Sequence, residues 1–141
     1  MASYVTTSCE ETELLGKALM STLPTTAFVA LFGDLGAGKT AFVRGMVRSF
    51  LPSEIVTSPT YNIVNSYTDG AVTLYHYDMY RITDDDDLFS VGFYDNLDGA
   101  IVVAEWCENI PFALPETYVR VTIRKDPDDD SKRYIDMEQV C

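Results

Sequence analysis

Histidine and cysteine are rare in this 141-residue chain, and their scarcity limits its metal and redox chemistry. His76 is the only histidine, which excludes a metal site built on several imidazoles. The three cysteines, Cys9, Cys107 and Cys141, are widely spaced and form no C-x-x-C pair. They therefore indicate neither a disulfide framework nor a zinc site, as is usual for intracellular proteins.

Long hydrophobic runs are also missing. The longest, Ala27–Phe32 and Ala100–Ala104, are far shorter than the roughly 20 apolar residues that cross a bilayer. The segment Met1–Tyr4 lacks the basic and apolar stretches of a secretory signal. We therefore expect a cytoplasmic protein without a membrane partner.

Basic residues are outnumbered, with Lys and Arg totalling 10 against 22 Asp and Glu, for a formal net charge of −12. A negative surface repels nucleic-acid phosphates, which argues against unaided binding to DNA or RNA. The 47% hydrophobic content is typical of a globular chain rather than a disordered one. The length fits a single domain over residues 1–141.

Hydrophobic periodicity predicts an α/β fold with a mixed sheet, because helices and strands alternate early and strands cluster late. The first helix is expected to begin after Ser8, where Ser8–Glu11 fits a capping box, and to end at Pro24. A strand buried on both faces follows at Ala27–Phe32. The other expected elements are a helix that follows Gly33–Gly38, buries apolar residues between 42 and 50 and stops at Pro52, strands at 61–67, 72–77 and 100–104, a helix start at 84–87, and a terminal hairpin of strands 118–124 and 133–138.

The most specific motif is Gly33–Thr40, G-D-L-G-A-G-K-T, a full match to the phosphate-loop pattern G-x-x-x-x-G-K-[ST]. Its glycines allow a tight turn in which backbone N–H groups and a helix dipole face phosphate oxygens. Lys39 would neutralise the β- and γ-phosphates, and the Thr40 hydroxyl would coordinate magnesium. We expect ATP to contact Asp34, Leu35, Gly36, Ala37, Gly38, Lys39, Thr40 and Ala41.

Two acidic residues end predicted strands and can serve the metal and the attacking water of a P-loop NTPase. Asp78 follows Val72–Tyr77, and Glu105 follows Ala100–Ala104. The residues alone leave open which carboxylate binds metal and which orients water. Either residue can also be an ordinary solvated strand end.

The base is not predicted to be guanine, because no Asn is followed by Lys as the N-K-x-D motif requires. Trp106 directly follows Glu105 and offers a flat ring on which adenine can stack. The alternative is that this single tryptophan fills the end of the sheet.

Four motifs occur in one order: G-D-L-G-A-G-K-T, Ser58-Pro59-Thr60-Tyr61, His76-Tyr77-Asp78-Met79-Tyr80-Arg81 and Glu105-Trp106. Together they resemble the TsaE (YjeE) family, the P-loop ATPases of bacterial tRNA threonylcarbamoyladenosine biosynthesis. The resemblance covers nearly the whole chain. It implies a three-layer P-loop NTPase-like domain with a mixed, largely parallel central sheet and a C-terminal antiparallel hairpin.

The resemblance also implies roles for single residues. Thr60 lies in a switch-like loop that senses the γ-phosphate, and Trp106 matches an aromatic residue near the nucleotide. Arg133 matches an arginine of the last hairpin that approaches the nucleotide, with a surface role as the alternative. The predicted catalytic residues are thus Lys39, Thr60, Asp78 and Glu105, and the predicted metal ligands are Thr40, Asp78 and Glu105.

The activity implied by the resemblance is slow, Mg²⁺-dependent ATP hydrolysis regulated by the partners TsaB and TsaD, through which tRNA is reached only indirectly. Two alternatives remain from the residues themselves. One is a small-molecule P-loop kinase, although the arginines are scattered rather than gathered in a lid. The other is a non-hydrolytic module whose docking surface is set by ATP.

Overall fold

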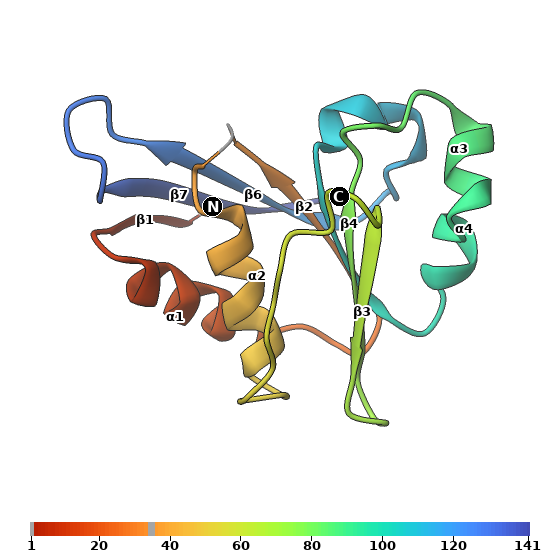
Figure 1. Cartoon of the computed structure of the whole chain (residues 1–141), viewed down its shortest axis with the longest axis horizontal. Helices are drawn as coiled ribbons and strands as arrows, with labels where there is room; N and C mark the ends of the chain where they lie inside the picture. The colour runs from red at the N-terminus through yellow and green to blue at the C-terminus, as the bar shows by residue number, and fades with distance from the viewer. Residues whose placement is uncertain (1, 34–35) are drawn as a thin grey trace.

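The computed structural model of the chain describes residues 2–33 and 36–141. Within this part, seven strands form one sheet in the order β1-β7-β6-β2-β5-β4-β3, with helices on both faces (Figure 1). The elements are β1 (Ala2–Thr6), α1 (Cys9–Met20), β2 (Ala27–Phe32), α2 (Lys39–Arg48), β3 (Val64–Thr68), β4 (Thr73–Asp78), α3 (Asp85–Ser90), α4 (Phe93–Asn96), β5 (Ile101–Glu105), the 3₁₀ turns η1 (Cys107–Asn109) and η2 (Pro111–Ala113), β6 (Tyr118–Lys125) and β7 (Arg133–Val140).

The centre of the sheet is parallel and its margins are antiparallel. Strand β2 pairs in parallel with β5 and β6, and β4 pairs in parallel with β5. Strands β3, β7 and β1 add antiparallel pairings at the two sides. The predicted α/β fold, with its mixed sheet and C-terminal hairpin, is confirmed.

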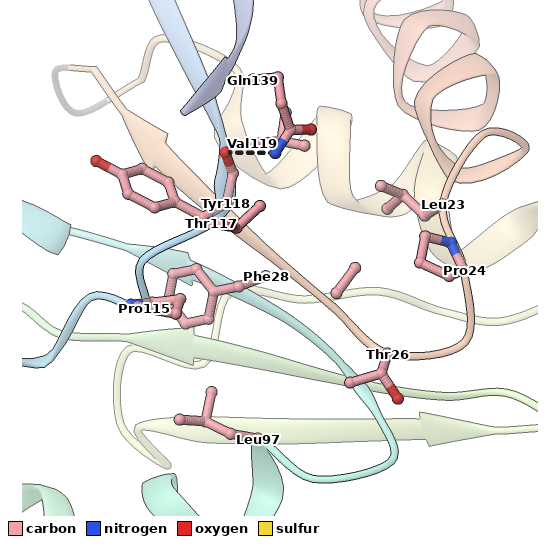
Figure 2. Close-up of a pocket in the computed structure, with 11 residues that line it drawn as sticks. Leu23, Pro24, Thr26, Phe28, Leu97, Pro115, Thr117, Tyr118, Val119 and Gln139 are labelled. Atoms are coloured by element: carbon pink, nitrogen blue, oxygen red, sulfur yellow. Dashed lines mark hydrogen bonds between the residues drawn. The ribbon is translucent and has the colours of Figure 1, made fainter. Parts of the chain in front are cut away.

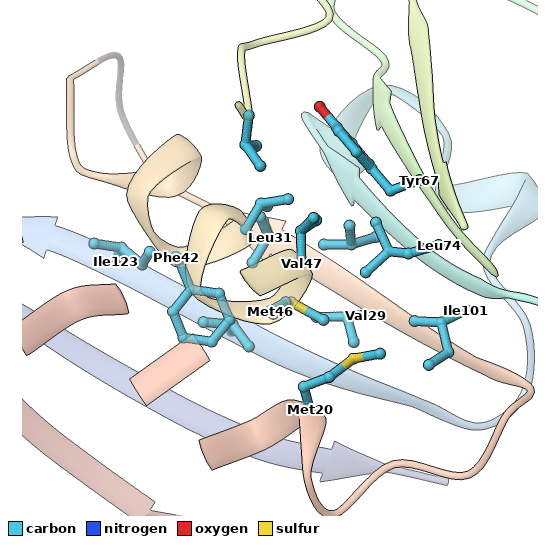
Figure 3. Close-up of a cluster of buried hydrophobic side chains, with 14 of the residues drawn as sticks. Met20, Val29, Leu31, Phe42, Met46, Val47, Tyr67, Leu74, Ile101 and Ile123 are labelled. Atoms are coloured by element: carbon cyan, nitrogen blue, oxygen red, sulfur yellow. The ribbon is translucent and has the colours of Figure 1, made fainter. Parts of the chain in front are cut away.

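Two hydrophobic clusters lie on opposite faces of the sheet and make the fold three-layered. The first packs α1 and α2 against the sheet through Phe42, Met46 and Val47 of α2 (Figure 3). The second gathers Tyr77 and Phe93, whose rings meet edge-on with centroids 5.5 Å apart, under α3 and α4. None of the helices among residues 2–33 and 36–141 is long and apolar enough to cross a membrane.

Helices α1 and α2 approach so closely that the contact requires glycine on both. A Cβ atom added to Gly45 of α2 would lie 1.8 Å from the carbonyl oxygen of Glu13, and one added to Gly16 of α1 would lie 2.1 Å from that of Phe42. The close approach holds α2, which carries the end of the phosphate loop, against the rest of its layer.

Three predicted boundaries were wrong by several residues and one strand was missed. The first helix, expected to reach Pro24, ends at Met20, and the second, expected to stop at Pro52, ends at Arg48. The strand expected at 61–67 begins only at Val64, because Ile63 adopts a left-handed conformation (φ 68°) and its N–H bonds to the Pro59 carbonyl at 2.7 Å. Strand β1 was not predicted because its residues are exposed up to Val5 and show no alternation. Its pairing partner is β7, at the far end of the chain. The first helix begins as predicted, with Ser8 Oγ accepting a hydrogen bond from Glu11 N at 3.1 Å.

Candidate functional site

The phosphate loop connects the end of the central strand β2 to the first turn of α2. Gly38, the N-cap of α2, has a φ of 105°, a left-handed conformation that favours glycine. Because α2 begins directly after Gly38, the positive end of its dipole points into the loop. The predicted nucleotide contacts Asp34 and Leu35 lie outside the described residues.

Lys39 has a buried side chain that touches three groups. Its Nζ donates a hydrogen bond to the Gly33 carbonyl at 2.7 Å and lies 3.9 Å from Glu105 Oε1. It also lies 4.5 Å from the centroid of the Trp106 ring. The ammonium group thus occupies the junction between the phosphate loop and the end of β5.

A cavity of ≈ 250 Å³ opens beside this ammonium group. Its walls come from the phosphate loop, the start of α2, the loop before β3 and the ends of β4 and β5. They comprise Gly36, Gly38, Lys39, Thr40, Ser58, Thr60, Asp78, Glu105 and Trp106. The structure therefore brings all the residues predicted as catalytic or metal-binding into one cavity.

The other three predicted nucleotide contacts lie around this cavity rather than in its wall. Ala37 is fully buried, and its carbonyl accepts a hydrogen bond from Arg133 Nε at 3.0 Å. Ala41 and Arg133 line a neighbouring cavity of ≈ 140 Å³ that also reaches Gly38. Arg133 Nη2 donates to the Gly36 carbonyl at 3.3 Å, so this arginine braces the phosphate loop from β7.

The two acidic residues are neighbours across the sheet. Asp78 and Glu105 face each other in the register of β4 and β5, at the carboxyl ends of both strands. Both side chains are buried. Asp78 Oδ1 accepts a hydrogen bond from Tyr80 N at 3.0 Å, which fixes the orientation of this carboxylate.

The loop before β3 carries two hydroxyls to the rim of the cavity. Ser58 Oγ and Thr60 Oγ1 lie 2.8 Å apart, and both residues are exposed. The loop is attached to the acidic strand end, because Asp78 N donates to the Ile63 carbonyl at 2.8 Å. The loop and the Asp78 backbone are therefore directly connected.

Trp106 turns the chain sharply after Glu105. It adopts a left-handed conformation with a φ of 60°, which is strained for a residue with a side chain. Its ring meets Tyr80 edge-on with centroids 5.1 Å apart, in addition to its contact with Lys39. The next residue, Cys107, is inert, because burial raises the pKa of its thiol and Sγ donates to the Ala104 carbonyl.

His76 was not predicted as a site residue, yet it contacts the site directly. Its Nε2 lies 2.5 Å from Glu105 Oε2, and its side chain is completely buried. The signal in the sequence was its spacing, since residues two apart on a strand share one face and His76 precedes Asp78 by two positions. A polar side chain on the buried face of a strand needs a partner, and here that partner is Glu105.

The oxygen atoms in the cavity suit a hard cation. Thr40, Asp78 and Glu105 supply one hydroxyl and two carboxylates, the ligand types that Mg²⁺ prefers. Among the residues that the structure describes, no group of three or more His, Cys, Asp or Glu side chains could hold a metal. This set therefore fits Mg²⁺ completed by phosphate and water, as is usual for nucleotide sites, rather than a cage made only of protein.

A larger cavity lies elsewhere. It has a volume of ≈ 380 Å³ and surrounds the start of β2, at the opposite end of that strand from the phosphate loop (Figure 2). Its lining is mainly apolar, with Leu23, Phe28 and Leu97 among the side chains that face it. Of the residues that the structure describes, none lines it with a carboxylate or ammonium group, whereas the smaller cavity is lined by Lys39, Asp78 and Glu105.

Comparison with known proteins agrees with this geometry. The family model described as "Threonylcarbamoyl adenosine biosynthesis protein TsaE" matches residues 6–135. The tRNA threonylcarbamoyladenosine biosynthesis protein TsaE of Rickettsia felis is 36% identical over 115 residues, which are 81% of this chain and 67% of the relative. The Bacillus subtilis protein is 34% identical over 125 residues, or 89% of this chain and 78% of the relative.

A solved structure has the same fold. The crystal structure of Bacillus subtilis YdiB superposes with a TM-score of 0.78 and 28% sequence identity, covering 99% of this chain and 84% of that one. The match extends over the sheet and both helical layers. With its phosphate loop, paired acidic strand ends and matching family model, this chain belongs to the TsaE family.

Proposed function

We propose that the protein binds and hydrolyses ATP in support of tRNA threonylcarbamoyladenosine biosynthesis. The pathway comes from the names of its relatives. The observation that carries the ATPase proposal is the cavity that Lys39, Thr40, Thr60, Asp78 and Glu105 share. A phosphate loop, two carboxylates and a hydroxyl-bearing loop are the parts that a P-loop ATPase requires.

Lys39 and the start of α2 would bind the phosphates. The ammonium group already faces the cavity, and the backbone N–H groups at the start of α2 need acceptors there. Thr40 and Asp78 would hold Mg²⁺, which when bound would neutralise charge on the phosphate oxygens. We assign the metal to Asp78 rather than to Glu105, because the two oxygens of Glu105 already face His76 and Lys39.

Glu105 would orient the attacking water and accept its proton. Its Oε1 faces Lys39, so it lies beside the place where the γ-phosphate would bind. The water oxygen attacks the γ-phosphorus, the bond to the bridging oxygen of ADP breaks, and ADP and phosphate leave. Ser58 and Thr60 would sense the γ-phosphate from the rim of the cavity.

The partners proposed are homologues of TsaB and TsaD, with tRNA reached only through them. The net charge of −12 supports this arrangement, because it disfavours direct contact with a polyanion such as tRNA. Binding of ATP is compatible with the same charge, since backbone N–H groups, Lys39 and a metal act locally. A cytoplasmic location and one domain over residues 1–141 stay predictions.

A P-loop kinase receives less support, because none of the six arginines, all of which the structure describes, lines the cavity, and each contacts another group of the protein. Kinases of this type close an arginine-bearing lid over the phosphates. Four of the arginines pair with carboxylates: Arg44 and Arg48 with Glu13, Arg120 with Glu138, and Arg124 with Asp136. Arg81 lies over the Tyr61 ring, and Arg133 donates a hydrogen bond to the Ala37 carbonyl of the phosphate loop.

The test is release of phosphate from ATP and Mg²⁺ by the purified protein, alone and with TsaB and TsaD homologues and tRNA. We expect slow turnover by the protein alone and faster turnover with the partners. Absence of turnover under all conditions, with ATP still bound, would favour a non-hydrolytic ATP-gated module. Transfer of phosphate to a small molecule instead of water would favour a kinase.

A further inference from the structure

The buried contact between His76 and Glu105 is the strongest feature that the proposed chemistry does not use. His76 lies on β4 and Glu105 at the end of β5, and the imidazole Nε2 and carboxylate Oε2 are 2.5 Å apart. The same carboxylate points its other oxygen, Oε1, toward Lys39 Nζ at 3.9 Å. Glu105 is therefore held from two sides, by one oxygen each.

The hydrogen-bond pattern assigns the donor. His76 Nδ1 is buried and has no hydrogen-bond partner. An unpaired buried N–H costs more than an unpaired lone pair, so the proton belongs on Nε2, where Glu105 accepts it. The imidazole therefore directs one N–H donor at one carboxylate oxygen.

The position of His76 in the sheet makes this donor rigid. It pairs with Val103 on one side and Asn65 on the other, in the register of three adjacent strands. Its side chain has no exposed surface, so it has little freedom to turn away. A donor on a strand interior orients its partner more precisely than one on a loop.

We propose that His76 is a positioning residue for Glu105. By holding Oε2, it keeps Oε1 directed at the cavity and at Lys39, the orientation needed to align water on a γ-phosphate. This role rests on the ATPase function proposed above. His76 is not among the residues that line the cavity, so it would act only through Glu105.

Two amide variants separate donation from simple packing. The side-chain nitrogen of Gln can occupy the place of His Nε2, whereas that of Asn lies nearer the place of Nδ1. His76→Asn should lower kcat by about 10- to 100-fold, the range for losing a hydrogen bond to a charged group. The Kd for ATP should change less than about threefold, because the phosphate loop is untouched. His76→Gln should recover most of the wild-type kcat.

Controls address folding and the proposed function. Tyr75→Phe, on the opposite face of β4, should leave kcat unchanged. If His76→Asn does not fold, His76→Leu removes the donor without placing an unpaired polar side chain at position 76, and the same loss of kcat is expected. Wild-type turnover is measured first, because its absence would overturn the ATPase proposal and this role together. Wild-type turnover with an equally active His76→Asn or His76→Leu variant would overturn only the role of His76.

A spectroscopic readout reports the contact without any turnover. As the only histidine, His76 gives a single set of imidazole signals in long-range ¹H–¹⁵N NMR spectra. We expect the pattern of the Nε2–H tautomer in the wild-type protein and a shift of the Nε2 signal in Glu105→Ala. An Nδ1–H tautomer, or an Nε2 signal that ignores the loss of Glu105, would overturn the proposal.

Discussion

The ammonium nitrogen of Lys39 lies 4.5 Å from the centroid of the Trp106 ring. Because this lysine belongs to the phosphate loop, the only tryptophan in the chain stands at the end of the cavity that this loop forms. Cation–π attraction contributes about 0.5–2 kcal/mol in such pairs, so the ring helps to hold the lysine in place. This position supports a phosphate-side role for Trp106 over adenine stacking.

Trp106 fluorescence distinguishes these two roles. Binding of phosphates to Lys39 should change the electrostatic surroundings of the ring, so inorganic triphosphate with Mg²⁺ should alter the emission in a saturable way. Adenosine at the same concentration should not. The Lys39→Ala variant should lose the response, whereas Lys17→Ala, on the exposed face of α1, should keep it. A response to adenosine alone would instead support stacking of adenine on Trp106.

Arg133→Ala should weaken ATP binding without contact between the arginine and the nucleotide. The guanidinium donates to the carbonyls of Ala37 and Gly36, and its loss frees the phosphate loop. Each such bond contributes about 0.5–1.5 kcal/mol, so we expect the Kd to rise about 5- to 100-fold. Calorimetric titration with ATP and Mg²⁺ measures the change. The matched variant Arg124→Ala, whose side chain is exposed on β6, should bind like the wild type, and equal Kd values for all three proteins would contradict the bracing role.

Gly45→Ala should destabilise the fold. The added methyl group would lie 1.8 Å from the Glu13 carbonyl oxygen, so the α1–α2 contact must open. We expect the free energy of unfolding in urea to fall by at least about 2 kcal/mol, within the range of overpacking substitutions. Leu14→Ala serves as the control, because that side chain on α1 is exposed and its loss should have little effect. Similar unfolding midpoints for the two variants would show that the helices can separate at no cost.

Tyr134→Phe should destabilise the protein, and the loss of stability should be greater at neutral pH than in acid. The Tyr134 hydroxyl donates to Asp126 Oδ2 at 2.6 Å, and this bond is the main cause that lowers the pKa of Asp126 below 3.8. A lowered pKa in the folded chain stabilises it above the unfolded value, and the contribution is lost as the pH falls through the folded value. The difference in urea midpoint between wild type and variant should therefore shrink from about pH 6 to about pH 3. A difference that stays constant over this interval would contradict the assignment.

Local patterns predicted much of the fold and most of the site. The motif Gly33–Thr40 can be recognised from eight consecutive residues. Asp78 and Glu105 end strands that are visible as apolar runs. Contacts between distant segments were beyond such patterns. Strand β1 exists because β7 pairs with it, and Arg133 reaches Ala37 across 96 positions.

His76 illustrates the same limit at the site. Its residue type and its place on β4 could be read from the sequence, but its partner depends on the register of β4 against β5. Ile63 is a second example, because no pattern indicates a left-handed conformation for a β-branched residue. Both features arise where neighbouring segments, rather than local propensity, determine the geometry.

The most direct test of the ATPase proposal is single-turnover hydrolysis of ATP by Glu105→Gln in the presence of Mg²⁺. This variant keeps the shape of the side chain and its contact with His76 but cannot accept a proton. We predict that ATP binds with a Kd close to that of the wild type while the rate of hydrolysis falls by at least about 100-fold, as expected for loss of a general base. Hydrolysis at the wild-type rate would contradict the assignment of Glu105 as the residue that activates water.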